Sequence, residues 1–172
     1  MQALREGDRS AFDVVYDLHR PRIHGWLLRT TRDRAIAEEL LQETFLRLAR
    51  HASRLRPDTN LRAWLFTVAR NLERSRRRWA WLDASRVLSF GDQPRAVAPT
   101  PEDLAGASEA QRRLDLALAA LSRTSREVLL LVVYEGLEPS EAAAVLGIRP
   151  DALRQRLARA RAELADHLGE ER

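Results

Sequence analysis

The chain has 172 residues, of which 45% are hydrophobic and 31% charged, a composition typical of a globular protein of one ordinary domain or two small ones. The net charge is +4 and all 29 basic residues are arginines, whose clustering suits a polyanionic partner. The absence of cysteine excludes a disulfide framework and a thiolate metal site. The first residues are no secretory signal, and the longest apolar run, 128–134, is far shorter than the roughly 20 residues that span a bilayer, so we expect a cytoplasmic protein without membrane insertion.

The first segment is predicted to be an amphipathic helix that ends near two helix-breaking residues. Asp8 and Ser10 precede this segment, and Ser10, with Asp13 three positions later, forms a start that resembles a capping box. Pro21 and Gly25 are predicted to interrupt the helix, and a short second segment follows at 23–28. The side chains predicted to share one side of the first helix are Phe12, Val15, Tyr16 and His19.

A second long helix is predicted to begin after a cap at Asp33 and to run to about His51. Apolar residues recur along it at helical spacing, so one face should pack against the core. This apolar stripe consists of Ile36, Leu40, Leu41, Phe45, Leu48 and Ala49.

Acidic and amide side chains lie mostly outside that stripe. Solvation, with acids favoured near a helix N-terminus, explains Glu38 and Glu39 better than Gln42 and Glu43. An acidic surface that docks on a basic protein partner is the other interpretation, and the residues by themselves leave both open.

A loop is predicted at 54–60 from the turn-forming Pro57 and Asp58, and a third helix follows it. At about 100° per residue, Phe66 falls on the side opposite the helix's apolar stripe. An exposed ring among arginines suits single-stranded nucleic acid, because bases stack on the ring while guanidinium groups hold phosphates. Alternatively, Phe66 packs under a neighbouring helix; for Trp64 the core is favoured. The stripe is Leu61, Leu65, Val68 and Leu72, and the opposite side carries Arg70, Arg74 and Arg77.

Residues 83–108 are predicted to be a linker, because they are rich in proline, glycine, alanine and serine and show no sustained periodicity. Helical spacing returns near Ser108 with Leu114, Leu118 and Leu121, and 122–125 are predicted to end that helix. An apolar helix is predicted at 126–134, closed by the following Glu-Gly pair. The linker's charges become acidic: Asp92, Glu102 and Asp103.

The stretch 137–164 is predicted to form two helices around a tight turn. Gly147 suits the left-handed cap of the first helix, and Pro150 can open the second because its missing N–H costs nothing there. Leu153, Leu157, Ala160 and Leu164 give the second helix a buried face. Its other faces carry Arg154, Gln155, Arg156, Arg159 and Arg161.

This pattern is that of a helix-turn-helix whose second helix lies in a DNA major groove, where arginine can pair with guanine and glutamine with adenine. The alternative is an ordinary helical hairpin with a solvated basic face. No two of the four histidines have the spacing of a helical metal site, and neither a phosphate-binding glycine loop nor a nucleophile elbow is present. We therefore expect neither catalytic nor metal-binding residues and no cofactor, and an all-helical enzyme is the weaker interpretation.

With these parts in place, nearly the whole chain resembles a bacterial sigma factor of the extracytoplasmic-function (ECF) group in the sigma-70 family. Residues 37–46 (AEELLQETFL) resemble the family's helix for core RNA polymerase, and 63–78 (AWLFTVARNLERSRRR) its helix for the −10 element. Residues 121–164, with the phrases REVLLL and RLARAR, resemble the domain that reads the −35 element.

The resemblance implies an all-α fold of two small helical domains joined by a flexible linker, the C-terminal one a helix-turn-helix. Sigma region 2 would occupy 1–82, the linker 83–108 and sigma region 4 residues 109–172. The function implied is promoter-specific transcription initiation, with the chemistry left to the polymerase. The linker would thread toward the RNA exit channel, so replacing its three acidic residues by alanine is expected to alter abortive initiation or promoter escape.

The resemblance also implies partners and contact residues. The β′ clamp helices would bind Glu38, Glu39, Gln42 and Glu43, and the β flap is a further contact on the polymerase. Single-stranded −10 DNA would contact Asn60, Arg62, Phe66, Arg70, Asn71, Arg74, Arg77 and Arg78. Duplex −35 DNA would contact Arg149, Asp151, Ala152, Arg154, Gln155, Arg156 and Arg159. Relatives are commonly held inactive by an anti-sigma factor, which is therefore an expected partner.

The chain departs from its relatives at two places. Ser75 stands where many relatives have aspartate, and 151–155 (DALRQ) replaces a common Gly-Thr-Val-Lys-Ser phrase. Both changes bear on the DNA sequence that is read, and Asp151 would be repelled by phosphates unless it accepts a bond from cytosine. A stand-alone helix-turn-helix repressor or activator and an RNA-binding helical protein are the rival interpretations; neither needs an acidic polymerase-binding face.

Overall fold

The computed structural model describes residues 1–87 and 108–169, and within them the side chains of 1–82 and 108–169. All regular secondary structure in these ranges is helical, which confirms the predicted all-α class. The chain divides into two compact units, Met1–Ala96 and Val97–Arg172. Most of the predicted linker, including Asp92, Glu102 and Asp103, lies outside the described residues.

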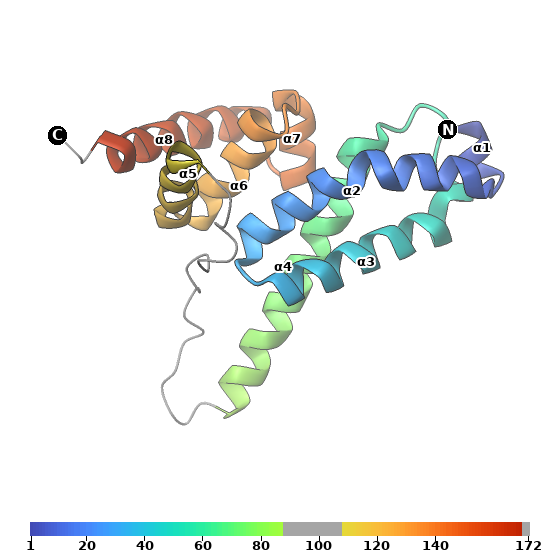
Figure 1. The fold of residues 1–172 in the computed structure, drawn as a ribbon, viewed down its shortest axis with the longest axis horizontal. Helices are drawn as coiled ribbons and strands as arrows, with labels where there is room; N and C mark the ends of the chain where they lie inside the picture. The colour runs from blue at the N-terminus through green and yellow to red at the C-terminus, as the bar shows by residue number, and fades with distance from the viewer. Residues whose placement is uncertain (88–107, 170–172) are drawn as a thin grey trace. The chain divides into compact units, whose positions relative to one another are not determined.

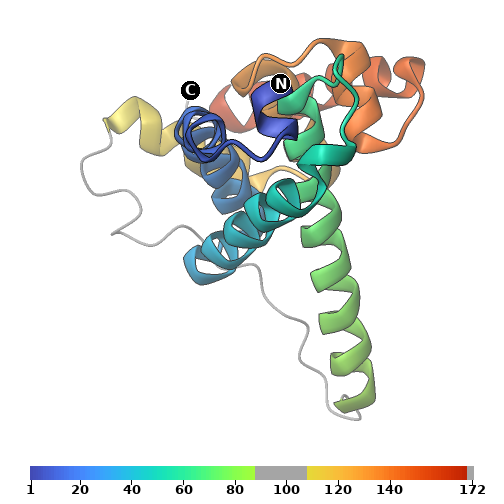
Figure 2. The ribbon, with the colours of Figure 1, turned by 90° about the vertical axis from the view of Figure 1, so that its right-hand side faces the viewer.

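The N-terminal unit is built around three long helices, α2, α3 and α4, each of which packs against the other two. Figure 1 shows α2 and α3 running side by side, and in both Figure 1 and Figure 2 the C-terminal part of α4 extends well beyond them. Helix α4 continues into the segment predicted as linker. The elements are α1 (Gln2–Arg5), α2 (Arg9–Thr31), α3 (Arg34–His51), the 3-10 turn η1 (Ala52–Arg54) and α4 (Leu61–Val87).

Helix α2 is continuous through Pro21, so the predicted interruption at Pro21 and Gly25 is wrong. Ile23, Trp26 and Leu27 just beyond the proline are buried on one face, and this packing outweighs the single backbone hydrogen bond that proline removes. The capping-box-like start at Ser10 is also wrong, because the helix begins at Arg9, directly after Asp8. Asp8 caps it, with its carboxylate accepting a hydrogen bond from the Ala11 N–H at 3.0 Å.

Helix α3 begins and ends as predicted, and the Asp33 carboxylate accepts from the Ile36 N–H at 2.9 Å. Its apolar stripe is buried or half-buried except for Ala49, which is exposed. The predicted side of α2 meets this stripe, with the rings of Tyr16 and Phe45 edge to face at 4.7 Å between centroids. Aromatic contacts thus hold α2 against α3.

The C-terminal unit consists of helices that gather around the last one: α5, α6 and α7 each pack against α8. The predicted break after Leu121 is shorter than expected, because Ser122 caps α6 directly and its hydroxyl accepts from the Ser125 N–H at 3.2 Å. The elements are α5 (Glu109–Ala120), α6 (Arg123–Leu129), the π-helical turn η2 (Leu130–Tyr134), α7 (Pro139–Leu146) and α8 (Pro150–Gly169).

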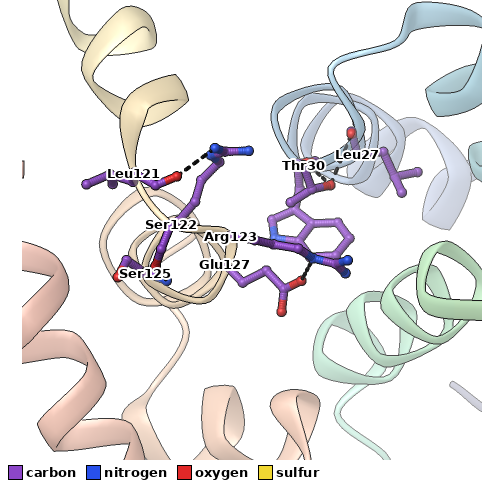
Figure 3. A network of polar contacts seen from close by, with 9 residues as sticks. Leu27, Thr30, Leu121, Ser122, Arg123, Ser125 and Glu127 are labelled. Carbon is purple, nitrogen blue, oxygen red and sulfur yellow. Dashed lines mark hydrogen bonds and ion pairs between the residues drawn. The ribbon is translucent and has the colours of Figure 1, made fainter. Parts of the chain in front are cut away.

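A buried arginine joins α5 to α6. The Arg126 guanidinium donates to the carbonyls of Leu118 at 2.7 Å, Ala119 at 2.9 Å and Leu121 at 2.9 Å, and only 7% of the residue is exposed. These are carbonyls that the end of α5 leaves without helical partners. Figure 3 shows the Leu121 carbonyl accepting one of these bonds, beside the Ser122 cap and the Arg123–Glu127 ion pair.

The turn between α7 and α8 has the predicted geometry. Gly147 takes the left-handed conformation, with φ +61°, and the Ile148 N–H donates to the Ala143 carbonyl at 3.0 Å. Pro150 is the first residue of α8, as its sequence position predicts. Among the described residues, no helix is long and apolar enough to cross a membrane.

Candidate nucleic-acid and protein interfaces

The four predicted acidic and amide residues share the solvent side of α3. Glu38, Glu39 and Gln42 are exposed and Glu43 is half-buried. All three acids form ion pairs with arginines of the same unit. These pairs are Arg34–Glu38 at 3.1 Å, Arg47–Glu43 at 3.0 Å and Arg76–Glu39 at 3.1 Å. The acidic face is therefore offset in part by its own arginines, and a basic partner must compete with them.

The second candidate surface runs along α4. Arg74, Arg77 and Arg78 are exposed, Asn71 is exposed and Arg70 is half-buried. At about 100° per residue these five positions fall within one broad face of the helix, opposite Leu65 and Leu72 in the core. The structure thus gathers five of the predicted −10 residues into one basic strip.

Phe66 does not belong to that strip. Its side chain is fully buried, with 0% exposed, and its ring lies edge to face on Trp26 at 6.0 Å between centroids. The second sequence interpretation, packing under a neighbouring helix, is therefore correct, and the assignment of Phe66 as a DNA-stacking residue is wrong. Phe66 is buried although it falls opposite the predicted stripe, because α4 packs against both α2 and α3. Trp64, expected in the core, is half-buried.

Two predicted residues lie at the start of α4. The Asn60 side-chain oxygen accepts from the Ala63 N–H at 3.1 Å, so this oxygen serves as the helix cap. Arg62 is half-buried and lies near His19 of α2. Burial, and then the charges of Arg22 and Arg62, lower the pKa of His19 below its usual 6.5. In the preceding loop, Arg56 and Asp58 form a two-bond ion pair at 3.1 and 3.2 Å.

The third candidate surface is the outward face of α8. Leu153 and Ala160 are fully buried, and Leu157 and Leu164 are half-buried, so the predicted packing face is confirmed. The residues predicted to contact duplex DNA lie on the other faces. Arg149, Asp151, Arg154, Gln155 and Arg159 are exposed, and Ala152 and Arg156 are half-buried.

Asp151 has a partner within the helix. Its carboxylate lies 3.1 Å from the Arg154 guanidinium, one turn later, and both side chains are mostly exposed. The ion pair offsets the charge that would otherwise repel phosphates, and it orients the arginine.

Sequence reasoning missed two arginines that the structure singles out. Arg76 lies on a different side of α4 from Arg74 and Arg78 and pairs with Glu39 on α3. Arg126 is buried although arginine is rarely found inside proteins. The charge of Glu39 is the one sequence signal for Arg76, and the position of Arg126 directly after a predicted helix end is the one for its capping role. Among the described residues, no group of three or more potential ligands could hold a metal ion.

Comparison with known proteins assigns both units to families. Sigma-70 region 2 matches residues 15–82, and Sigma-70, region 4 matches residues 111–164. RNA polymerase sigma factor CarQ of Myxococcus xanthus is 36% identical over 171 residues, which cover 99% of this chain and 96% of that protein. ECF RNA polymerase sigma factor SigL of Mycobacterium tuberculosis is 34% identical over 145 residues, covering 84% and 81%.

Solved structures with the same fold lead to the same family. The sigma factor RpoE, in complex with the anti-sigma factor NepR from Bartonella quintana, superposes with a TM-score of 0.78 at 26% identity over 94% of this chain and 99% of that chain. CnrH, in complex with the cytosolic domain of CnrY, gives 0.70 at 26% identity over 99% and 96%. The chain therefore belongs to the extracytoplasmic-function group of the sigma-70 family, whose members bind core RNA polymerase and direct promoter-specific transcription initiation.

Proposed function

We propose that this sigma factor divides its work among three surfaces. The acidic face of α3 binds the β′ clamp helices of core polymerase, and the basic strip of α4 holds the opened −10 strand. The outward face of α8 reads duplex −35 DNA, and the β flap supports the C-terminal unit. Region 2 then corresponds to 1–82, region 4 to 109–172, and 83–108 connects them.

One observation carries this proposal: a single compact unit presents an acidic face on α3 and a basic strip on the adjacent α4. A basic protein and a DNA strand are thereby held side by side, as initiation requires. A stand-alone repressor gains nothing from the acidic face. An RNA-binding protein would use the basic strip without polymerase.

The chain contributes recognition and strand opening, and the catalytic chemistry stays in the polymerase. A base leaves the duplex only if protein contacts replace its stacking and pairing, and the arginines of α4 supply the charge for such a site. Because its partner is RNA polymerase, we place the protein in the cytoplasm. RpoE was solved with an anti-sigma factor, and we infer a regulator of the same kind here, one that masks the polymerase and DNA surfaces.

The decisive test is a charge reversal on α3. Glu39→Arg with Glu43→Arg should abolish binding to core polymerase while leaving the intrinsic DNA affinity of the free chain intact or raised. Asp13→Arg with Asp17→Arg is the matched control, because both aspartates are exposed residues of the same unit on α2. Normal polymerase binding by the α3 variant, or equal losses in both variants, would reject the assignment of this face.

A further inference from the structure

Two large aromatic side chains stand exposed near the end of α4. Trp79 is 57% and Trp81 is 67% exposed. Tryptophan is highly buried on average, so a ring left in solvent on a long helix is a candidate contact for a partner. The C-terminal part of α4 extends beyond α2 and α3, so these helices do not cover it (Figures 1 and 2).

The two rings lie on different sides of the helix. Trp81 follows Arg74 by two turns and follows Arg77 and Arg78 by one turn, so at about 100° per residue it falls in the middle of the basic strip. Trp79 follows Leu72 by two turns and thus continues the apolar stripe. Only Trp81 is surrounded by arginines.

A depression along α4 brings these groups together. It is lined by Asn71, Arg74, Ser75, Arg77, Arg78 and Trp81. Guanidinium groups bind phosphates, an aromatic ring stacks on a base, and the small polar side chains donate or accept hydrogen bonds at base edges. This combination fits an unpaired nucleic-acid strand better than a duplex, because bases in a duplex already stack on each other and leave no face for the ring.

We propose that Trp81 is a base-stacking residue, which holds one unpaired base of the promoter strand opened by this sigma factor. The proposal rests on the proposed role of α4 and extends its contact surface beyond the arginines, to the end of the helix. Arg74, Arg77 and Arg78 fix the backbone, and Trp81 occupies the face of a single base. The contact forms only after strand separation, so it stabilises the open promoter and not the closed one.

The test uses holoenzyme reconstituted from the full chain and core polymerase, with two DNA probes carrying one promoter. One probe is fully paired, and the other has a mismatched bubble over the −10 element. Trp81→Ala should weaken binding to the bubble probe by roughly 5- to 150-fold, the usual effect of removing one stacking ring, and leave the paired probe nearly unchanged. Trp81→Phe should restore most of the loss. Trp79→Ala, the matched control on the other side of the helix, should change either affinity by no more than about twofold.

An abasic scan locates the partner base. Each bubble probe lacks one base. At one position, the missing base should weaken binding as much as Trp81→Ala does, and Trp81→Ala should then weaken binding to that probe no further. If the losses of affinity from the missing base and from Trp81→Ala add fully at every position, the proposal is overturned. So would a Trp81→Ala defect in polymerase binding without DNA, which would make Trp81 a protein contact.

The same probes separate this inference from the proposed function. If Arg74→Ala and Arg78→Ala weaken bubble binding and Trp81→Ala does not, α4 binds the opened strand and the stacking proposal alone fails. If none of the three variants weakens it, the assignment of α4 itself fails.

Discussion

The Arg76 guanidinium on α4 lies 3.1 Å from the carboxylate of Glu39 on α3, linking the helix proposed to hold DNA with the helix proposed to bind polymerase. The side chains are 42% and 65% exposed. An ion pair this exposed adds only about 0–1 kcal/mol to folding stability, so stability does not explain its position. A basic polymerase surface that binds Glu39 would have to displace Arg76 from this carboxylate.

Arg76→Ala should therefore raise the affinity for core polymerase in the absence of DNA. The carboxylate no longer has an internal competitor, and an exposed pair of about 0–1 kcal/mol corresponds to an increase of up to about fivefold. Binding of labelled chain to core polymerase at low salt measures the effect. Repeating the change in a Glu39→Ala background should abolish it, and weaker polymerase binding by Arg76→Ala would contradict the competition.

Arg126→Ala should destabilise the C-terminal unit by about 3 kcal/mol or more, because it leaves the buried carbonyls of Leu118, Ala119 and Leu121 without their charged donor. Hydrogen exchange of α5 and α6 in the full chain measures the loss. The stability of Arg126→Lys should fall between that of the unchanged protein and that of Arg126→Ala, since an ammonium cannot match the geometry of a guanidinium fork.

The exposed Arg159 provides the control for this prediction. Arg159→Ala should change the stability of the same unit by less than about 0.5 kcal/mol, as is usual for surface positions. If α5 and α6 are equally protected from hydrogen exchange in Arg126→Ala and in Arg159→Ala, the capping role of Arg126 is wrong.

His19 should make the N-terminal unit less stable in acid. Its pKa is lower when folded than the unfolded value of 6.5, so below about that pH the unfolded chain binds more protons and stability falls. Urea unfolding of the full chain at about pH 8 and about pH 5, monitored by hydrogen exchange of the α2 amides, measures this difference in the free energy of unfolding. His19→Gln should reduce it, and an identical pH dependence in the variant would show that His19 is not responsible.

Arg154 and Arg74 should differ in what they contribute to DNA binding. If Arg154 contacts a base edge as proposed, Arg154→Ala should cost about 1–3 kcal/mol and relax the preference at one −35 position. If Arg74 contacts phosphate as proposed, Arg74→Ala should weaken binding on all promoters and reduce the salt dependence of binding. Binding to promoter libraries at several salt concentrations distinguishes them; equal effects on every promoter from both changes would mean that the base-reading residue was misassigned.

Local signals predicted the start of α3 and the turn between α7 and α8. Asp33 and Gly147 cap helices as expected, because a cap depends on the residue and the few positions next to it. The apolar faces of α3 and α8 were likewise predictable from spacing. The family resemblance came from the same strings of residues, and the comparisons confirm it.

The wrong predictions concern residues whose burial or pairing depends on packing with a helix distant in the sequence. Nothing near Pro21 in the sequence reveals that Trp26 and Leu27 will be buried, so the continuity of α2 could not be predicted. Phe66 occupies the polar side of an isolated helix wheel, yet Trp26 of α2 covers it. The pairing of Arg76 with Glu39 likewise requires the packing of α4 on α3, which spacing alone does not supply.

The most direct test of the whole account is a reconstitution. The purified chain is mixed with bacterial core polymerase and a genomic-fragment library, and the starts of the transcripts are sequenced. We expect transcript starts that depend on the chain, share two upstream elements and disappear with the Glu39→Arg, Glu43→Arg variant. Specific duplex binding by the chain alone, with neither polymerase binding nor dependent starts, would contradict it.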